Sequence, residues 1–129
     1  MSAAYVDTSV LAGIALGEPG AERFALALRR FDRLLSSNLL EAEIRAVFRR
    51  EGEAFEDDVI AGLEWILPDR LLSAELATTL SAGYLRGADL WHIATALYVA
   101  PRPASLTFAT LNVEQGRVAS ALGFPKCRI

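Results

Sequence analysis

The sequence predicts an α/β protein in which a parallel sheet is covered by helices on both faces. Short apolar strands alternate with longer segments whose apolar residues recur at three- and four-residue spacing. The strands are apolar on both faces, which is typical of a sheet buried between two helical layers. We therefore expect a single domain over residues 1–129, with a ligand-binding edge at the carboxyl ends of its strands.

Four segments have the composition of strands, and seven have helical periodicity. The strand segments are AAYVDTS at 3–9, RLLSSN at 33–38, WILPDR at 65–70 and SLTFATLN at 105–112. Within WILPDR, Pro68 is expected to end the strand. The expected helices are Val10–Gly17, Gly20–Asp32, Leu39–Glu53, Phe55–Glu64, Ala74–Tyr84, Leu90–Ala100 and Val113–Leu122.

Composition excludes several classes of protein. One cysteine, Cys127, and one histidine, His92, provide neither an internal disulfide nor a structural zinc site. The first residues lack the features of a signal peptide, and the apolar run Leu90–Ala100 is too short to cross a bilayer. We therefore expect a cytoplasmic protein with no membrane partner. A net charge of −3 is also unlike that of most nucleic-acid-binding domains, which are basic.

Asp7 closes the first predicted strand, in the run DTS. It can serve as a helix cap, because Asp, Thr and Ser all accept hydrogen bonds from the free N–H groups at a helix start. One cap is enough, however, so Thr8 or Ser9 can fill that role and leave Asp7 facing the ligand-binding edge. The residues alone leave both interpretations open.

Two glutamates in the segment SSNLLEAEIRAVFRR differ in their helical neighbours. Glu43 borders an apolar stripe that contains Leu40 and Val47, whereas Glu41 is placed for an i,i+4 ion pair with Arg45. This spacing predicts that Glu43 points inward and Glu41 outward. The alternative is that Glu43 lies at the edge of the stripe with its carboxylate in solvent.

The segment RGADLWHIATALYVA supplies Asp89 and His92. Asp89 either caps a helix that begins at Leu90 or, if the helix begins near Arg86, shares a helical face with His92. His92 could orient a carboxylate or contact a substrate, and it could equally be a hydrogen-bonded residue of the core.

Together these acids predict a cluster of carboxylates at the carboxyl ends of the strands. Like charges in a cleft raise one another's pKa, so such a cluster favours a bound counter-ion. Oxygen ligands without thiolates or several histidines suit Mg²⁺ or Mn²⁺. These cations bind phosphate groups, and a metal-activated water can attack a phosphodiester.

Four motifs resemble those of the PIN-domain ribonucleases, and most closely the VapC-like toxins of bacterial toxin–antitoxin pairs. They are YVDTSVL, SSNLLEAEIRAVFRR, RGADLWHIATAL and LTFATLNVEQGRVASALGF, in this order. The resemblance implies a three-layer α/β/α sandwich with a small, mainly parallel sheet of four to five strands. It also implies an endoribonuclease dependent on Mg²⁺ or Mn²⁺, with Asp7, Glu43 and Asp89 as catalytic and metal-binding acids.

The fourth acidic position departs from that pattern. Relatives usually have Asp after the last strand, where this chain has Asn112, so Asn112 is the expected fourth catalytic and metal ligand. An amide oxygen carries no formal charge, which predicts weaker metal binding. A shifted register would place Ala109 there, and Glu114 could compensate only if its loop bends inward. The residues expected to line the site are Ser9, His92, Arg45 and Arg86.

The resemblance also implies partners. We expect an RNA substrate, a VapB-like antitoxin, a homodimer, and a heterotetramer or larger assembly with the antitoxin. Phe24, Leu28 and Phe31 of the early helices are the residues that we expect to contribute to antitoxin docking.

Two other functions remain open. Asn112 could leave the fold catalytically impaired, so that the protein acts as an antitoxin-binding and dimerisation module. A receiver-like phosphoacceptor domain would also have an acid at the end of its first strand. Such domains need paired acids there and a late-strand lysine, whereas Asp7 has no acidic neighbour and the only lysine, Lys126, follows the last helix.

Overall fold

A four-stranded parallel sheet forms the centre of the computed structural model, which describes residues 2–128. The strands are β1 (Ala3–Val6), β2 (Arg33–Ser37), β3 (Glu64–Ile66) and β4 (Thr107–Ala109). Their order across the sheet is β3-β2-β1-β4, and all three pairings are parallel. The predicted α/β class, with a mainly parallel sheet of four to five strands, is confirmed.

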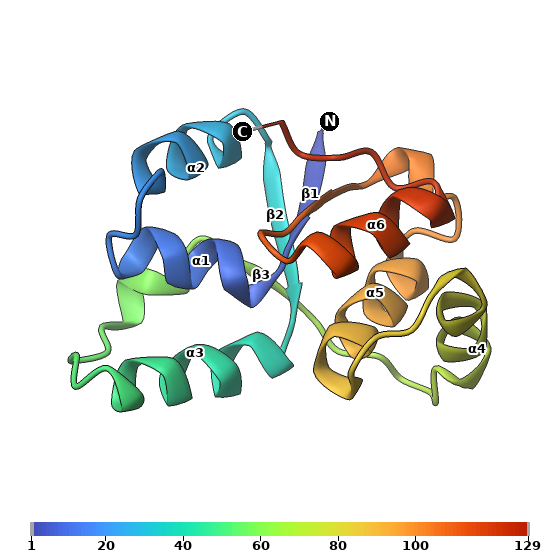
Figure 1. Ribbon diagram of the computed structural model, residues 1–129, viewed down its shortest axis with the longest axis horizontal. Helices are drawn as coiled ribbons and strands as arrows, with labels where there is room; N and C mark the ends of the chain where they lie inside the picture. Colours follow the sequence, from blue (N-terminus) through green and yellow to red (C-terminus); the bar gives the residue numbers. More distant parts are fainter. Residues whose placement is uncertain (1, 129) are drawn as a thin grey trace.

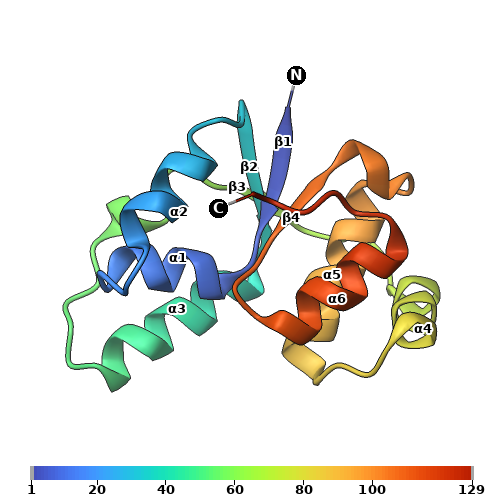
Figure 2. The same ribbon diagram turned by 45° about the horizontal axis from the view of Figure 1, so that its top comes forward.

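Six α-helices cover the two faces of the sheet. Figures 1 and 2 show α1, α2 and α3 on one side and α4, α5 and α6 on the other, which gives three layers. The helices are α1 (Thr8–Ala15), α2 (Ala21–Leu28), α3 (Leu39–Arg50), α4 (Ser73–Ala82), α5 (Gly87–Val99) and α6 (Val113–Leu122), with short 3₁₀ turns at Asp57–Val59 and Pro103–Ser105. Within residues 2–128, no helix has the length and apolar character needed to span a membrane.

The central strand β1 is buried on both faces, as expected for a strand between two helical layers. Tyr5 points into one half of the core, where it packs with Phe108 and Ile93. Its neighbour Val6 points into the other half and packs with Val10 of α1. This alternation fixes the register of β1, because a shift of one residue would exchange the two faces.

The predicted helix over Phe55–Glu64 is wrong. Only Asp57–Val59 form a 3₁₀ turn, and Glu64 already belongs to β3. The apolar residues of this segment that suggested a helix, including Val59 and Leu63, pack instead against the buried face of α3. Asp57, Asp58 and Gly62 disfavour a helix here, and tertiary packing accounts for the apolar spacing that imitated one.

The early helices do not expose the aromatic surface that we expected for antitoxin docking. Phe24 and Leu28 are buried, and the partly buried Phe31 packs against the same part of the core. Leu26, on the opposite face of α2, is 59% exposed. The residues selected by hydrophobicity are therefore those that attach α2 to the domain.

We predict that Gly83→Ala destabilises the fold by about 1–3 kcal/mol through overpacking. A Cβ at Gly83 would lie 2.8 Å from Cγ2 of buried Val118, and a β-branched side chain in a helix has little freedom to turn away. Urea unfolding measures the change. Gly62→Ala is the matched control, because its Cβ meets nothing within 4 Å. Equal unfolding midpoints for the two variants would contradict the prediction.

Candidate active site at the carboxyl ends of β1 and β4

The strand order creates a topological switch point between the ends of β1 and β4. These strands are neighbours, yet the chain passes from β1 into α1 on one side of the sheet and from β4 into α6 on the other (Figures 1 and 2). Open α/β sheets bind ligands at such switch points. Asp7 directly follows β1 and Thr110 directly follows β4, so both residues lie at this point.

Asp7 is the N-cap of α1 and also lies buried at this switch point. Its Oδ2 accepts a hydrogen bond from the backbone N–H of Ser9 at 3.0 Å, so Asp7 itself caps the helix, whereas Thr8 lies in its first turn. Its Oδ1 accepts from Nε2 of Gln115 at 3.2 Å. Asp7 is only 4% exposed, and its two roles are therefore compatible rather than alternative.

Glu43 points from α3 toward the same switch point. Its Oε1 accepts a hydrogen bond from the hydroxyl of Thr8 at 2.8 Å and lies 2.6 Å from Nε2 of His92. Burial acts to raise the pKa of Glu43, but the hydrogen bonds from His92 and Thr8 outweigh it and hold this pKa below its ordinary value. Glu41, in contrast, pairs outward with Arg45 at 2.7 Å.

A buried hydrogen-bond chain fixes the orientation of His92. The hydroxyl of Tyr5 contacts Nδ1 of His92 and accepts the backbone N–H of Ser37 at 3.1 Å. Burial raises the pKa of Tyr5 far above its ordinary value, so the hydroxyl keeps its proton and donates it to Nδ1. In the neutral imidazole, Nε2 then carries the ring proton and donates to Glu43.

Asp89 of α5 lies near the same switch point, next to Asn112. The helix begins at Gly87, so Asp89 lies in its first turn and on the same face as His92. Burial raises the pKa of Asp89, and the nearby charges of Asp7 and Glu43 raise it further. Arg86, the N-cap residue of α5, partly opposes this shift through its positive charge.

Asn112, the expected fourth ligand, lies with Gln115 at the start of α6. Oδ1 of Asn112 caps α6 by accepting the backbone N–H of Gln115 at 2.9 Å, so Nδ2 faces Oδ2 of Asp89 at 3.4 Å. The fully buried Gln115 donates to Asp7 and to the backbone carbonyl of Asp89, and accepts from the hydroxyl of Thr110 at 2.6 Å.

Sequence reasoning missed Thr8, Thr110 and Gln115. Thr8 and Gln115 hydrogen-bond the acids directly, and Thr110 approaches Oδ2 of Asp7 at 3.5 Å. Gln115 lies three residues after the helix cap, where a Glu or Gln is a known capping signal. That signal could have marked Gln115 as a structural residue, although not as a partner of a carboxylate more than a hundred positions earlier in the chain.

The structure separates the residues that were expected to line the site. Oγ of Ser9 accepts the backbone N–H of Leu111 at 3.0 Å and therefore ties α1 to the loop after β4. His92 contacts Glu43 directly. Arg45 lies elsewhere, because its guanidinium pairs with Glu41 and stacks over the ring of Phe55 at 4.3 Å.

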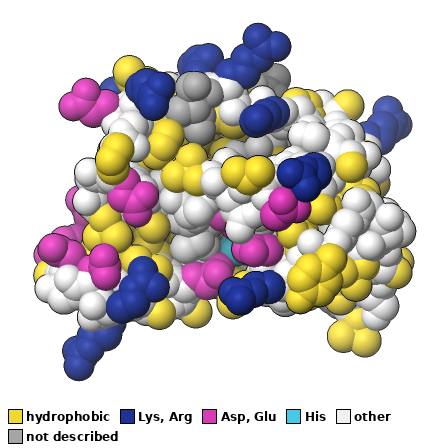
Figure 3. All heavy atoms as spheres, in the orientation of Figure 1, with side chains coloured by type: hydrophobic (Ala, Val, Ile, Leu, Met, Phe, Trp, Pro, Cys, Tyr) yellow, Lys and Arg dark blue, Asp and Glu magenta, His cyan; other side chains and the backbone are white. Residues whose placement is uncertain are grey.

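The donors match a hard divalent cation in chemistry, although they are not gathered as a ready-made metal site. Within residues 2–128, no three Asp, Glu, His or Cys side chains are arranged to hold a metal ion. Figure 3 nevertheless shows acidic side chains around the histidine on this face, and each carboxylate has more lone pairs than its hydrogen bonds use. The raised pKa of Asp89 indicates that an added positive charge would be favoured there.

These features define an α/β/α domain with an acidic site at the carboxyl edge of its sheet. Residues 4–101 match the family model described as PIN domain, which covers most of the chain. The chain therefore belongs to the PIN domain family, whose members are generally nucleases that use divalent metals. Comparisons with curated proteins and with solved structures give no significant match. Strand β4 and helix α6 lie beyond the matched residues.

We predict that Tyr5→Phe destabilises the fold by about 1–3 kcal/mol, because the buried N–H of Ser37 loses its acceptor. Nitrogen NMR of His92 should still report the Nε2–H tautomer, because Glu43 continues to accept a hydrogen bond from Nε2. Urea unfolding measures the stability change. Tyr98→Phe is the control, since its hydroxyl bonds the exposed Asp69 and its loss should matter little. Equal unfolding midpoints for Tyr5→Phe and Tyr98→Phe would contradict the proposed hydrogen-bond chain.

Proposed function

We propose that the protein is an endoribonuclease that depends on Mg²⁺ or Mn²⁺. The observation that carries this proposal is the convergence of three carboxylates from three separate elements at one edge of the sheet, where burial and then the charges of Asp7 and Glu43 raise the pKa of Asp89. A cation would relieve this repulsion and attract phosphate. Membership of a family of nucleases supports the same assignment.

Asp7, Glu43 and Asp89 are the residues that would hold the cation. When bound, it supplies Lewis acidity toward a phosphate oxygen and toward the attacking water. His92 and Thr8 orient the carboxylate of Glu43, while Gln115 holds that of Asp7. The hydrogen-bonded partners of ligating carboxylates commonly tune metal affinity, so these three residues are positioning residues.

We further propose that this ribonuclease is a VapC-like toxin. The support is the resemblance of its four motifs to such toxins, from the YVDTSVL segment to the segment that contains Asn112. On this proposal the protein is cytoplasmic, forms a homodimer, and is silenced by a VapB-like antitoxin in a heterotetramer or larger complex. The exposed apolar side chains near α4, among them Leu71 and Tyr84, are better candidates for such contacts than the buried Phe24.

A second candidate function is a catalytically impaired PIN-fold module that binds an antitoxin and dimerises. Asn112 favours it, because its amide oxygen is engaged in the α6 cap and its NH₂ group faces Asp89. The same orientation leaves the three acids without a fourth charge.

We predict that Glu43→Gln lowers Mg²⁺-dependent cleavage of RNA by at least about 100-fold, in the range expected when an electrostatic catalytic group is removed. Glutamine can still accept the hydrogen bonds of His92 and Thr8, so the fold should persist. Glu41→Gln is the matched control on the outer face of α3 and should cleave at the wild-type rate. Equal cleavage by both variants would contradict the nuclease assignment of this site. Cleavage that survives EDTA would contradict its dependence on a metal ion.

We predict that Asn112→Asp makes stability more dependent on metal. Aspartate can still cap α6, but its second oxygen would face Asp89 and add like-charge repulsion. In EDTA the variant should therefore melt below the wild type, and Mg²⁺ should raise its melting temperature more than that of the wild type. Thermal unfolding with and without Mg²⁺ measures this, and identical metal shifts would argue against a cation at this position.

A further inference from the structure

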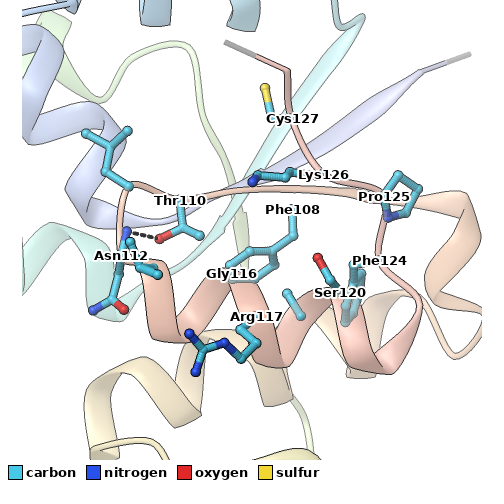
Figure 4. Close-up of a pocket in the computed structure, with 13 residues that line it drawn as sticks. Phe108, Thr110, Asn112, Gly116, Arg117, Ser120, Phe124, Pro125, Lys126 and Cys127 are labelled. Atoms are coloured by element: carbon cyan, nitrogen blue, oxygen red, sulfur yellow. Dashed lines mark hydrogen bonds between the residues drawn. The ribbon is translucent and has the colours of Figure 1, made fainter.

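A cavity of about 390 Å³ lies beside the acidic site, outside the part of the chain that matches the family. Figure 4 shows it between β4, helix α6 and the C-terminal segment 124–127. Its apolar lining includes the exposed Val113 and Pro125 and the buried Phe108 and Phe124, and Ser120 contributes a hydroxyl. Its volume falls within the roughly 300–1,000 Å³ of pockets that hold small organic groups.

The cavity is positively charged. Arg117 enters its lining from α6 and Lys126 from the C-terminal segment (Figure 4), and the lining includes no acidic residue. Three other hollows, lined in part by Glu53, Glu18 and Glu22, each contain at least one acid. In a chain of net charge −3, this cavity is therefore an unusual place where anions are favoured.

The two cations are available to a ligand. Lys126 makes no ion pair in the part of the chain that the structure describes. Arg117 pairs with Glu114 at 3.0 Å, but both side chains are more than 60% exposed, and such pairs contribute little. A phosphate could replace that pairing without exposing a buried charge.

The cavity and the acidic cluster share two residues. Thr110 lines the cavity and lies 3.5 Å from Oδ2 of Asp7, while Asn112 lines it and lies 3.4 Å from Oδ2 of Asp89. A group held in the cavity is therefore separated from the carboxylates by a single side chain. A polymer with one unit in the cavity would have its next linkage close to the acids.

We propose that this cavity binds one nucleotide of a single-stranded RNA, with its phosphate at Arg117 or Lys126. Every nucleobase has an apolar face that suits the largely apolar lining, and phosphate suits either cation. The proposal rests on the ribonuclease function proposed above and adds a substrate-binding site to it. It explains how an acidic protein can hold an anionic chain next to three carboxylates.

The first test fills the cavity. Ser120→Leu should weaken the binding of a short, fluorescently labelled single-stranded RNA by about ten-fold or more, measured by anisotropy in EDTA. Ala121→Leu is the matched control, because Ala121 is an exposed neighbour on α6 that does not line the cavity. Equal affinities for the two variants would overturn the proposal, whatever else occupies the cavity.

The second test changes the charge. Lys126→Glu should lower RNA affinity about five- to ten-fold and reduce the dependence of affinity on salt by about one phosphate contact. Arg49→Glu is the control, since Arg49 is exposed on α3 and outside the cavity lining. An equal loss in both variants would show only a general effect of net charge and would count against a specific site.

These experiments separate the two proposals. If Ser120→Leu binds and cleaves RNA like the wild type while Glu43→Gln is inactive, the nucleotide site is wrong and the nuclease assignment stands. If the wild type cleaves nothing with Mg²⁺ but Ser120→Leu and Lys126→Glu weaken RNA binding in EDTA, the nucleotide site stands without the nuclease assignment.

Titration with mononucleotides then distinguishes a free nucleotide from a unit of an RNA chain as the occupant of the cavity. Preferential binding of the free nucleotide would overturn the RNA proposal.

Discussion

The buried charge of Asp7 is the constraint on which the site depends. A carboxylate that is 4% exposed, at the end of the central strand, is costly unless its oxygens are hydrogen-bonded. Its hydrogen-bond partners are the backbone N–H of Ser9, the amide of Gln115 and, at 3.5 Å, the hydroxyl of Thr110, while Nε2 of His92 lies 3.8 Å from its Oδ1. They satisfy its hydrogen bonds without neutralising its charge, so its field reaches Asp89, whose pKa it raises.

The same constraint ties the site to the core. Glu43 is held by His92, His92 by Tyr5, and Tyr5 by the backbone of Ser37 in β2. Within this series of hydrogen bonds, the ring of Tyr5 also stacks on Phe108 of β4, with ring centroids 5.1 Å apart. The position of a carboxylate on α3 is thus set by residues of all three layers.

The alternation of strands and helices made the fold class predictable, and helical spacing separated Glu43 from Glu41 because it depends only on neighbours along the chain. The hydrogen bonds that hold the acids were not predictable, since Gln115 and Asp7 are 108 positions apart. The same limit explains the wrong helix at Phe55–Glu64, where apolar spacing reflects packing on α3. Local periodicity indicates whether a segment is a helix or a strand. Which side chains hydrogen-bond one another depends on the tertiary arrangement.

Charge balance connects the fourth position to the cavity. With Asn112 in place of an acid, Asp7, Glu43 and Asp89 supply three negative charges, and one divalent cation would leave a net charge of about −1 before any phosphate arrives. A phosphodiester adds another negative charge, so affinity must come from cations outside the cluster. Arg45 is engaged on the outer face of α3, and Arg86 stands at the start of α5. On the ribonuclease function proposed above, Arg117 and Lys126 would supply the missing positive charge to an RNA chain that extends past the cluster.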